Sequence, residues 1–90
     1  MRAVISVMGK DRPGIIARIS AVLYESNVNI LDLEQTVMRD ELFVMTMLVD
    51  LAGMSKPFRA LQEKLDEAAG EMGIQVKLQR EEIFKSMHRV

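Results

Sequence analysis

The chain has 90 residues, with 12 lysines and arginines against 13 aspartates and glutamates, and a formal net charge of −1. A chain of this length forms one domain with a modest core, and its scattered basic residues give no sign of a nucleic-acid partner. It has no cysteine and one histidine, which excludes disulfides and thiolate metal sites, so we expect neither a metal nor a cofactor.

The first predicted element is a strand over residues 2–8. Its apolar run is too short for a helix, and Ala3, Ile5 and Val7 alternate onto one face. The run ends at Gly9, whose missing side chain permits backbone conformations that other residues avoid. We therefore place a turn after this strand.

A loop and the start of a helix follow, over residues 9–15. Pro13 suits a first helical turn, and Asp11 has a short acceptor side chain that can cap the N–H groups after it. This pattern predicts a helix that starts near Arg12 or Pro13, with outward N–H groups that could bind a carboxylate or a phosphate. The same residues also fit a plain connector in which Asp11 only caps the helix, and spacing does not distinguish the two interpretations.

Two amphipathic helices are predicted, and both must pack against a sheet. In residues 13–26, one apolar stripe is formed by Ile15, Ile19, Val22 and Leu23. Asn27 then suits a left-handed helix end. The second helix, over residues 58–72, has apolar residues at spacings of three and four. Ser55 is its expected N-cap, Pro57 belongs to its first turn, and Gly73 ends it.

Two strands are expected between the helices, joined as a hairpin by the polar residues 39–41. The first, over residues 28–38, alternates imperfectly, so either both of its faces are partly covered or a bulge changes its register. The second, over residues 42–51, is largely apolar on both faces: Phe43, Met45, Met47 and Val49 on one, Leu42, Val44, Thr46 and Leu48 on the other. Such a strand needs cover on both sides. We expect a partner subunit or the chain's own tail to cover the face that the helices leave open.

The C-terminal part is predicted to contain a fourth strand and a helical tail. Residues 74–80 alternate, with Ile74, Val76 and Leu78 inward, as in an edge strand with one wet face. In residues 81–90, apolar side chains recur at helical spacing, at Ile83, Phe84 and Met87. We expect a short helix there that packs on another surface, such as that of a partner.

The order of these elements, βαββαβ, is that of a ferredoxin-like α+β fold with two layers. Right-handed crossovers place both helices on one face of an antiparallel sheet, and the expected strand order is 4-1-3-2. We therefore divide the chain into a domain over residues 1–80 and a C-terminal helical tail over residues 81–90.

The sequence shows no arrangement typical of an active site. Ser6, Ser20, Ser26 and Ser55 have no histidine near them in the sequence, and Ser86 and His88 both lie in the tail, so we do not expect an enzyme. Asp32 and Glu34 alternate onto one face of the predicted second strand, as either an acidic patch or a solvated edge. The chain lacks a membrane-length apolar run and a signal-peptide pattern, so we expect a cytoplasmic protein without membrane contact.

Two short segments carry a resemblance to a known family: Gly9-x-Asp11-Arg12-Pro13-Gly14-Ile15, and Asn29-Ile30 after one predicted helix. In this combination and in element order, residues 1–80 resemble the ACT domain family, small regulatory modules of amino-acid metabolism. With neither an enzyme nor a DNA-binding domain beside it, the chain is similar to the stand-alone, single-domain members related to regulators of glycine cleavage.

The resemblance implies a small effector, most often an amino acid, held at an interface between two domains. The ligand-binding positions it implies in this chain are Gly9, Lys10, Asp11, Arg12, Pro13, Gly14 and Ile15 in the loop, and Asn29 and Ile30 in the second strand. Loop N–H groups would bind the effector's carboxylate, while the oxygens of Asn29 and Asp11 would accept hydrogen bonds from its ammonium. Some amino-acid-sensing members differ at Gly9 and Asp11, so the identity of the effector does not transfer.

Two functional hypotheses follow. The first is a regulatory homodimer that binds an amino-acid effector at the subunit interface and acts on a protein target. The alternative is a protein–protein interaction module without an effector, which docks through its open sheet face.

Overall fold

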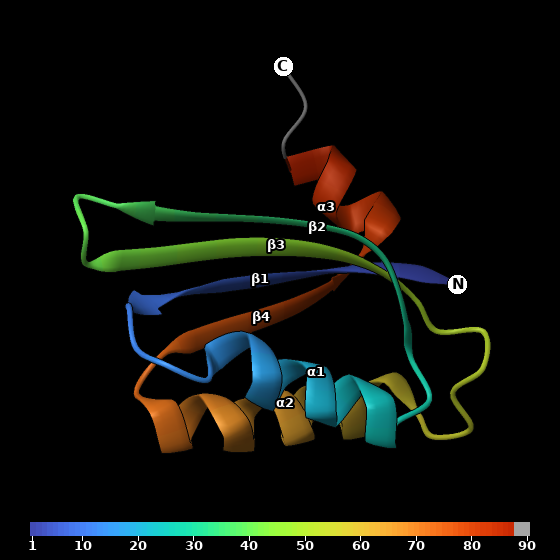
Figure 1. The fold of residues 1–90 in the computed structure, drawn as a ribbon. Coiled ribbons are helices and arrows are strands. Elements are labelled where there is room, and N and C mark those ends of the chain that lie inside the picture. Colours follow the sequence, from blue (N-terminus) through green and yellow to red (C-terminus); the bar gives the residue numbers. More distant parts are fainter. Residues whose placement is uncertain (88–90) are drawn as a thin grey trace.

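The computed structural model describes residues 1–87, which form a four-stranded sheet with two helices on one face and a third helix on the other (Figure 1). The elements are β1 (Arg2–Lys10), α1 (Ile15–Glu25), β2 (Asn29–Met38), β3 (Leu42–Asp50), α2 (Phe58–Met72), β4 (Gln75–Arg80) and α3 (Glu81–Met87). The strand order β2-β3-β1-β4, with antiparallel neighbours throughout, confirms the predicted ferredoxin-like arrangement. Residues 88–90 of the predicted tail lie outside the described residues.

The core lies between the sheet and the apolar sides of α1 and α2. Both predicted helix stripes are buried: Ile15, Ile19, Val22 and Leu23 in α1, and Leu61, Leu65, Ala68 and Ala69 in α2. On the sheet, Ile5 lies opposite both Met47 and Leu78, and all three are buried. Burying a large apolar side chain contributes about 1.5–3 kcal/mol, so this layer supplies the main stabilisation.

The edge strand β2 contains the bulge that its imperfect alternation suggested. Its pairing with β3 shifts register between Ile30 and Asp32. Ile30 and Leu33 are three residues apart and would lie on opposite faces of a regular strand. The extra residue, Leu31, lets both lie opposite residues of the core face of β3. The predicted hairpin is also confirmed: residues 39 and 40 have φ values of 53° and 61°, the left-handed pair of a tight hairpin turn.

The start of α1 differs from the prediction. The helix begins at Ile15, with Gly14 at the N-cap and a φ of 89°. Asp11 does not cap it, since no side chain forms a capping bond to this helix within the described residues. The N–H of Asp11 donates to the carbonyl of Glu41 at 2.7 Å and continues the ladder between β1 and β3. Gly14 is therefore the turn residue, since a positive φ strains any residue with a Cβ.

The start of α2 also corrects the prediction. Pro57 precedes the helix with an extended backbone, at φ −67° and ψ 155°, and the helix begins at Phe58. Ser55 makes no capping bond among the described residues. A proline disfavours a helical conformation in the residue before it, so the helix cannot begin early enough for Ser55 to reach its first N–H groups.

Strand β1 runs two residues beyond its predicted end. Gly9 pairs with Phe43 and Lys10 with Leu42, so neither belongs to the turn. A Cβ added at Gly9 would lie 2.5 Å from Cγ2 of Ile74 and 2.8 Å from its Cβ. Gly9 is thus required by the close approach of Ile74, and our prediction that it supplies an unusual turn conformation was wrong.

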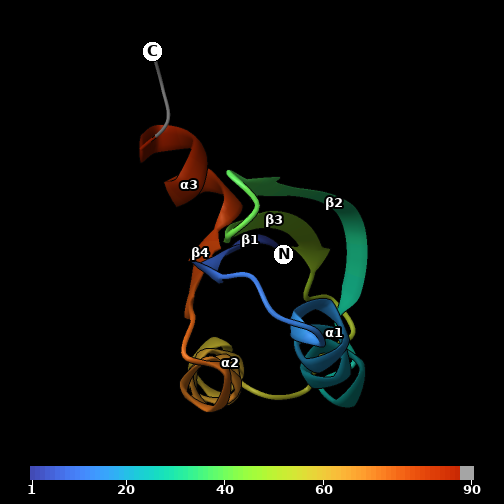
Figure 2. The same ribbon diagram turned by 60° about the vertical axis from the view of Figure 1, so that its left-hand side comes forward.

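Helix α3 lies on the open face of the sheet, in contact with β1 and β4 (Figure 2). Arg2 forms an ion pair with Glu81 at the start of this helix. Val4, which belongs to the open face, is buried there. The chain's own tail therefore covers the part of this face around Val4, while Met8 on β1 and Thr46 on β3 remain exposed. In residues 1–87, none of the helices has the length and apolarity needed to cross a membrane.

Candidate functional site

The loop between β1 and α1 borders a cleft of about 280 Å³ on the helix side of the sheet. Its lining residues are Asp11, Arg12, Gly14, Ile15, Ile16, Ala17, Gln35 and Phe43. β1 delivers the loop to one end of the sheet, the first turn of α1 forms one wall, and β2 forms the other through Gln35. The apolar part of the cleft comes from Phe43 and Ile16.

The first turn of α1 offers backbone donors to this cleft. The N–H groups of Ile15, Ile16 and Ala17 precede the first helical hydrogen bond, which Arg18 donates to the carbonyl of Gly14 at 2.9 Å. Within residues 1–87 no side chain caps this turn, and it contains no acidic residue. Free donors at the positive end of a helix favour an anion such as a carboxylate.

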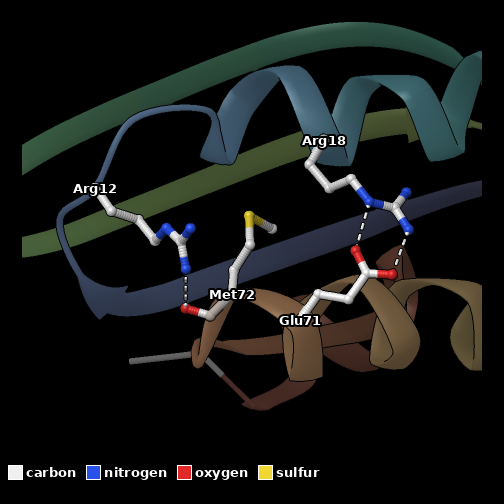
Figure 3. A network of polar contacts seen from close by, with 4 residues as sticks. All are labelled: Arg12, Arg18, Glu71 and Met72. Atoms are coloured by element: carbon white, nitrogen blue, oxygen red, sulfur yellow. Dashed lines mark hydrogen bonds and ion pairs between the residues drawn. The ribbon is translucent and has the colours of Figure 1, made fainter.

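Hydrogen bonds from two arginines link the loop and α1 to the end of α2 (Figure 3). Nη1 of Arg12 donates to the carbonyl of Met72 at 3.3 Å, at the negative end of α2. Nε and Nη2 of Arg18 donate to the two carboxylate oxygens of Glu71, at 2.9 and 3.2 Å. These bonds stabilise both charges, which raises the pKa of Arg18 and lowers the pKa of Glu71.

The other loop positions divide into two groups. Asp11 is exposed, and its carboxylate has no hydrogen-bond or ion-pair partner within the described chain. It lines the cleft together with Arg12, Gly14 and Ile15. Gly9, Lys10 and Pro13 do not line it.

Asn29 and Ile30 lie at the opposite end of the sheet from the loop. Asn29 pairs with Asp50, and Asp50 pairs with Arg2 at the start of β1. The loop follows Lys10, at the end of that strand. The nine residues of β1 span about 26 Å at the rise of an extended strand. Within one chain, the structure therefore does not bring the start of β2 to the loop.

Gln35 is a lining residue that the sequence reasoning missed. It faces the helices between Leu33 and Val37, at a register position opposite the buried Met45. The sequence did contain a signal for it: Gln35 is a polar residue at a position where the alternation of Leu33 and Val37 would lead one to expect an apolar one. No metal-binding group of three or more acidic or histidine residues occurs in residues 1–87, and His88 lies outside this range.

Comparison with known proteins gives consistent matches over the full domain. A model of the ACT domain family matches residues 2–79. A UPF0237 protein of Methanocaldococcus jannaschii is 53% identical over 89 residues, covering 99% of this chain and 98% of its own length. An ACT domain protein from Streptococcus pneumoniae superimposes with a TM-score of 0.80 at 33% identity, with 94% of each chain covered.

A more distant match shows the fold alone. The ligand-free regulatory subunit of aspartate kinase from Thermus thermophilus superimposes with a TM-score of 0.68 at 24% identity. The match covers 87% of this chain and 50% of that subunit.

Proposed function

Because this chain belongs to the ACT domain family, we propose that it is a regulatory module that binds a small effector, an amino acid, between two copies of itself. One observation carries the proposal. The two groups of positions implied by the family resemblance, the loop at residues 11–14 and the start of β2, lie at opposite ends of the sheet. A second copy is needed to bring them together.

The exposed edge of β2 supplies the surface for that second copy. All ten residues of β2 are exposed, and no other strand of the described chain pairs with its outer edge. Antiparallel pairing of two such strands about a two-fold axis places the start of one beside the end of the other. Asn29 of one copy would then approach the loop of the other. The exposed apolar side chains of Leu33, Val37 and Ile16 lie along this seam and would be covered by pairing.

The chemistry of the completed site fits a free amino acid. The N–H groups of the first turn of α1 would bind its carboxylate, and the oxygens of Asp11 and Asn29 would accept hydrogen bonds from its ammonium. Arg12 holds the loop in place through Met72. The cleft of one chain, at about 280 Å³, is just smaller than the roughly 300–1,000 Å³ of common ligand pockets, which agrees with a site completed by a partner.

The proposal is tested by sedimentation and by thermal unfolding with each of the twenty amino acids. We expect a dimer at micromolar concentration and a raised Tm with one or a few of them. An effector at 100 times its Kd adds about 2.7 kcal/mol to the free energy of unfolding. Asn29→Ala and Asp11→Asn should abolish the shift, whereas Thr36→Ala, an exposed change on the same strand, should preserve it. A monomer at every concentration, or a Tm unaffected by all twenty, would count decisively against the proposal.

The alternative is a protein interaction module that docks through the open sheet face without an effector. It is favoured by the β2–β3 half of that face, where Val44 and Leu48 are only half-buried and α3 makes its contacts with β1 and β4 instead. Capture of a partner from native lysate that is lost with Val44→Glu or Leu48→Glu, and kept with Asn29→Ala, would favour this function over the first.

A further inference from the structure

The open face of the sheet carries a groove that the proposed effector site does not use. It has a volume of about 680 Å³, and its lining includes Ser6, Met8, Val44, Thr46, Lys77 and Phe84. Strands β1, β3 and β4 form its floor, and Phe84 of α3 forms a wall. Its volume lies within the range of common ligand pockets, roughly 300–1,000 Å³. One chain supplies all of these residues, whereas the proposed effector site needs a second copy.

Polar donors form a single row across the floor of this groove. Ser6 lies opposite Thr46 on one side and opposite Lys77 on the other, so the three side chains share one face and one line. The next row consists of Val44, Met8 and Gln75, of which Val44 and Met8 are apolar and Gln75 is an uncharged amide. Within residues 1–87, the two hydroxyls and the ammonium of this row have no hydrogen-bond or ion-pair partner.

The two ends of this row differ in charge. Lys77 is the cation among the described lining residues of the groove. Glu34 lies beyond the opposite end of the row, paired with Thr46. Three strand spacings separate Glu34 from Lys77, or about 14 Å. An anion would therefore be held at the end formed by Lys77 and Ser6, away from Glu34. Beside that end, Phe84 and Met8 present an aromatic ring and a thioether, which suit an apolar group.

We propose that this groove binds a small carboxylic acid with an apolar body. The ammonium of Lys77 and the hydroxyl of Ser6 donate to its carboxylate, and the body packs against Phe84 and Met8. Charge complementarity selects this occupant, because the Lys77 ammonium has no ion-pair partner in residues 1–87 and lies at one end of a groove whose other described lining side chains carry no charge. The ion pair between Arg2 and Glu81 holds the first turn of α3 over the sheet, so the wall that carries Phe84 is part of the site.

The test is an NMR titration of the full chain, labelled with nitrogen-15, with 3-phenylpropionate as the probe. We expect saturable shifts of the amide signals of Ser6, Thr46 and Lys77, while those of Ile16 and Gln35 at the loop cleft stay unchanged. Uncharged 3-phenylpropanamide and short acetate should each bind about tenfold more weakly, because one lacks the charge and the other the apolar body.

Variants separate a specific site from general anion binding. Lys77→Gln should weaken the probe about tenfold, whereas Lys64→Gln, which removes an exposed lysine from α2, should leave it unchanged. Phe84→Leu keeps an apolar residue on α3 but removes the ring, and should also weaken binding. Three results would overturn the proposal: equal binding of the amide, binding indifferent to Lys77→Gln, or no shifts at the solubility limit. Shifts of the same signals on dilution without probe would instead assign the groove to a second copy of the chain.

Discussion

The two faces of the sheet differ in how complete their candidate sites are. On the helix side, the loop cleft has the residues of the family motif but only about 280 Å³ in one chain, and Asn29 lies at the far end of the sheet. On the open face, the groove has about 680 Å³ and draws all its described lining from one chain. In the proposed function, the family motif therefore marks half of a site, while the open-face groove carries no motif.

The two faces also differ in packing. On β1 and β3, the helix side buries its apolar sheet residues, with Met47 and Val49 at 0% exposure. On the open face, Val4 is buried but Met8 is 49% exposed. We therefore expect changes on the helix side to cost more stability than changes on the open face, and the following predictions test this order.

The largest effect is expected at Gly9, where β1 meets the core. Gly9→Ala would place a Cβ 2.8 Å from Cβ of Ile74 and 3.1 Å from its Cα, atoms that cannot move without shifting the backbone. We expect a loss of about 3 kcal/mol in the free energy of unfolding, measured by urea denaturation. Gly70→Ala is the matched control, because a Cβ there meets nothing within 4 Å. In a helix interior it should stabilise by about 0.5–1 kcal/mol. Equal effects of the two changes would refute this account of Gly9.

A smaller effect is expected from removing the tail. We propose that residues 1–80 fold as an ACT-like domain without residues 81–90. The deletion exposes Val4, which is now 5% accessible, and removes the ion pair between Arg2 and Glu81. We expect a loss of about 1–2 kcal/mol in the free energy of unfolding, with the cooperative transition retained. The affinity of the open-face groove for 3-phenylpropionate should also fall, because the deletion removes Phe84. An unfolded product would show instead that the tail belongs to the domain.

The smallest effect is expected at the ion pair that joins α1 to α2. The folded pKa of Glu71 lies below its ordinary value because Arg18 donates two hydrogen bonds to it. Its contribution to stability is therefore present above the unfolded pKa and is lost as the pH falls through the folded pKa. Glu71→Gln should lower Tm at pH 7 by about 2 °C or less, since both side chains are partly exposed.

The pH dependence provides the check on this last prediction. The difference in Tm between Glu71→Gln and the unaltered chain should shrink as the pH falls below the ordinary pKa of a glutamate and through the lower folded pKa of Glu71, where its carboxylate becomes protonated. Glu63 forms a longer ion pair on α2, with 4.0 Å between its carboxylate and Nε of Arg59. Glu63→Gln should therefore change Tm at pH 7 by less than Glu71→Gln does. A difference that grows in acid would contradict the assigned direction of the shift.

Local sequence patterns were enough to predict the elements and the fold. The stripe of Ile15, Ile19, Val22 and Leu23 and the inner face of β3 were read from periodicity and are found as predicted. Periodicity is a local property, because the face that a side chain occupies depends only on its position within its own helix or strand. The same holds for the hairpin turn and for Gly73, a left-handed end of α2 with a φ of 66°.

The contacts between distant segments follow only from the packing of the whole chain. This packing placed Ile74 against Gly9, and continued the β1–β3 ladder from Asp11 to Glu41, so that Gly14 rather than Asp11 begins α1. It also separated Asn29 from the loop by the length of a strand. The physical reason is that strand order, direction and register fix these approaches, and they join residues far apart in the chain that no local pattern relates.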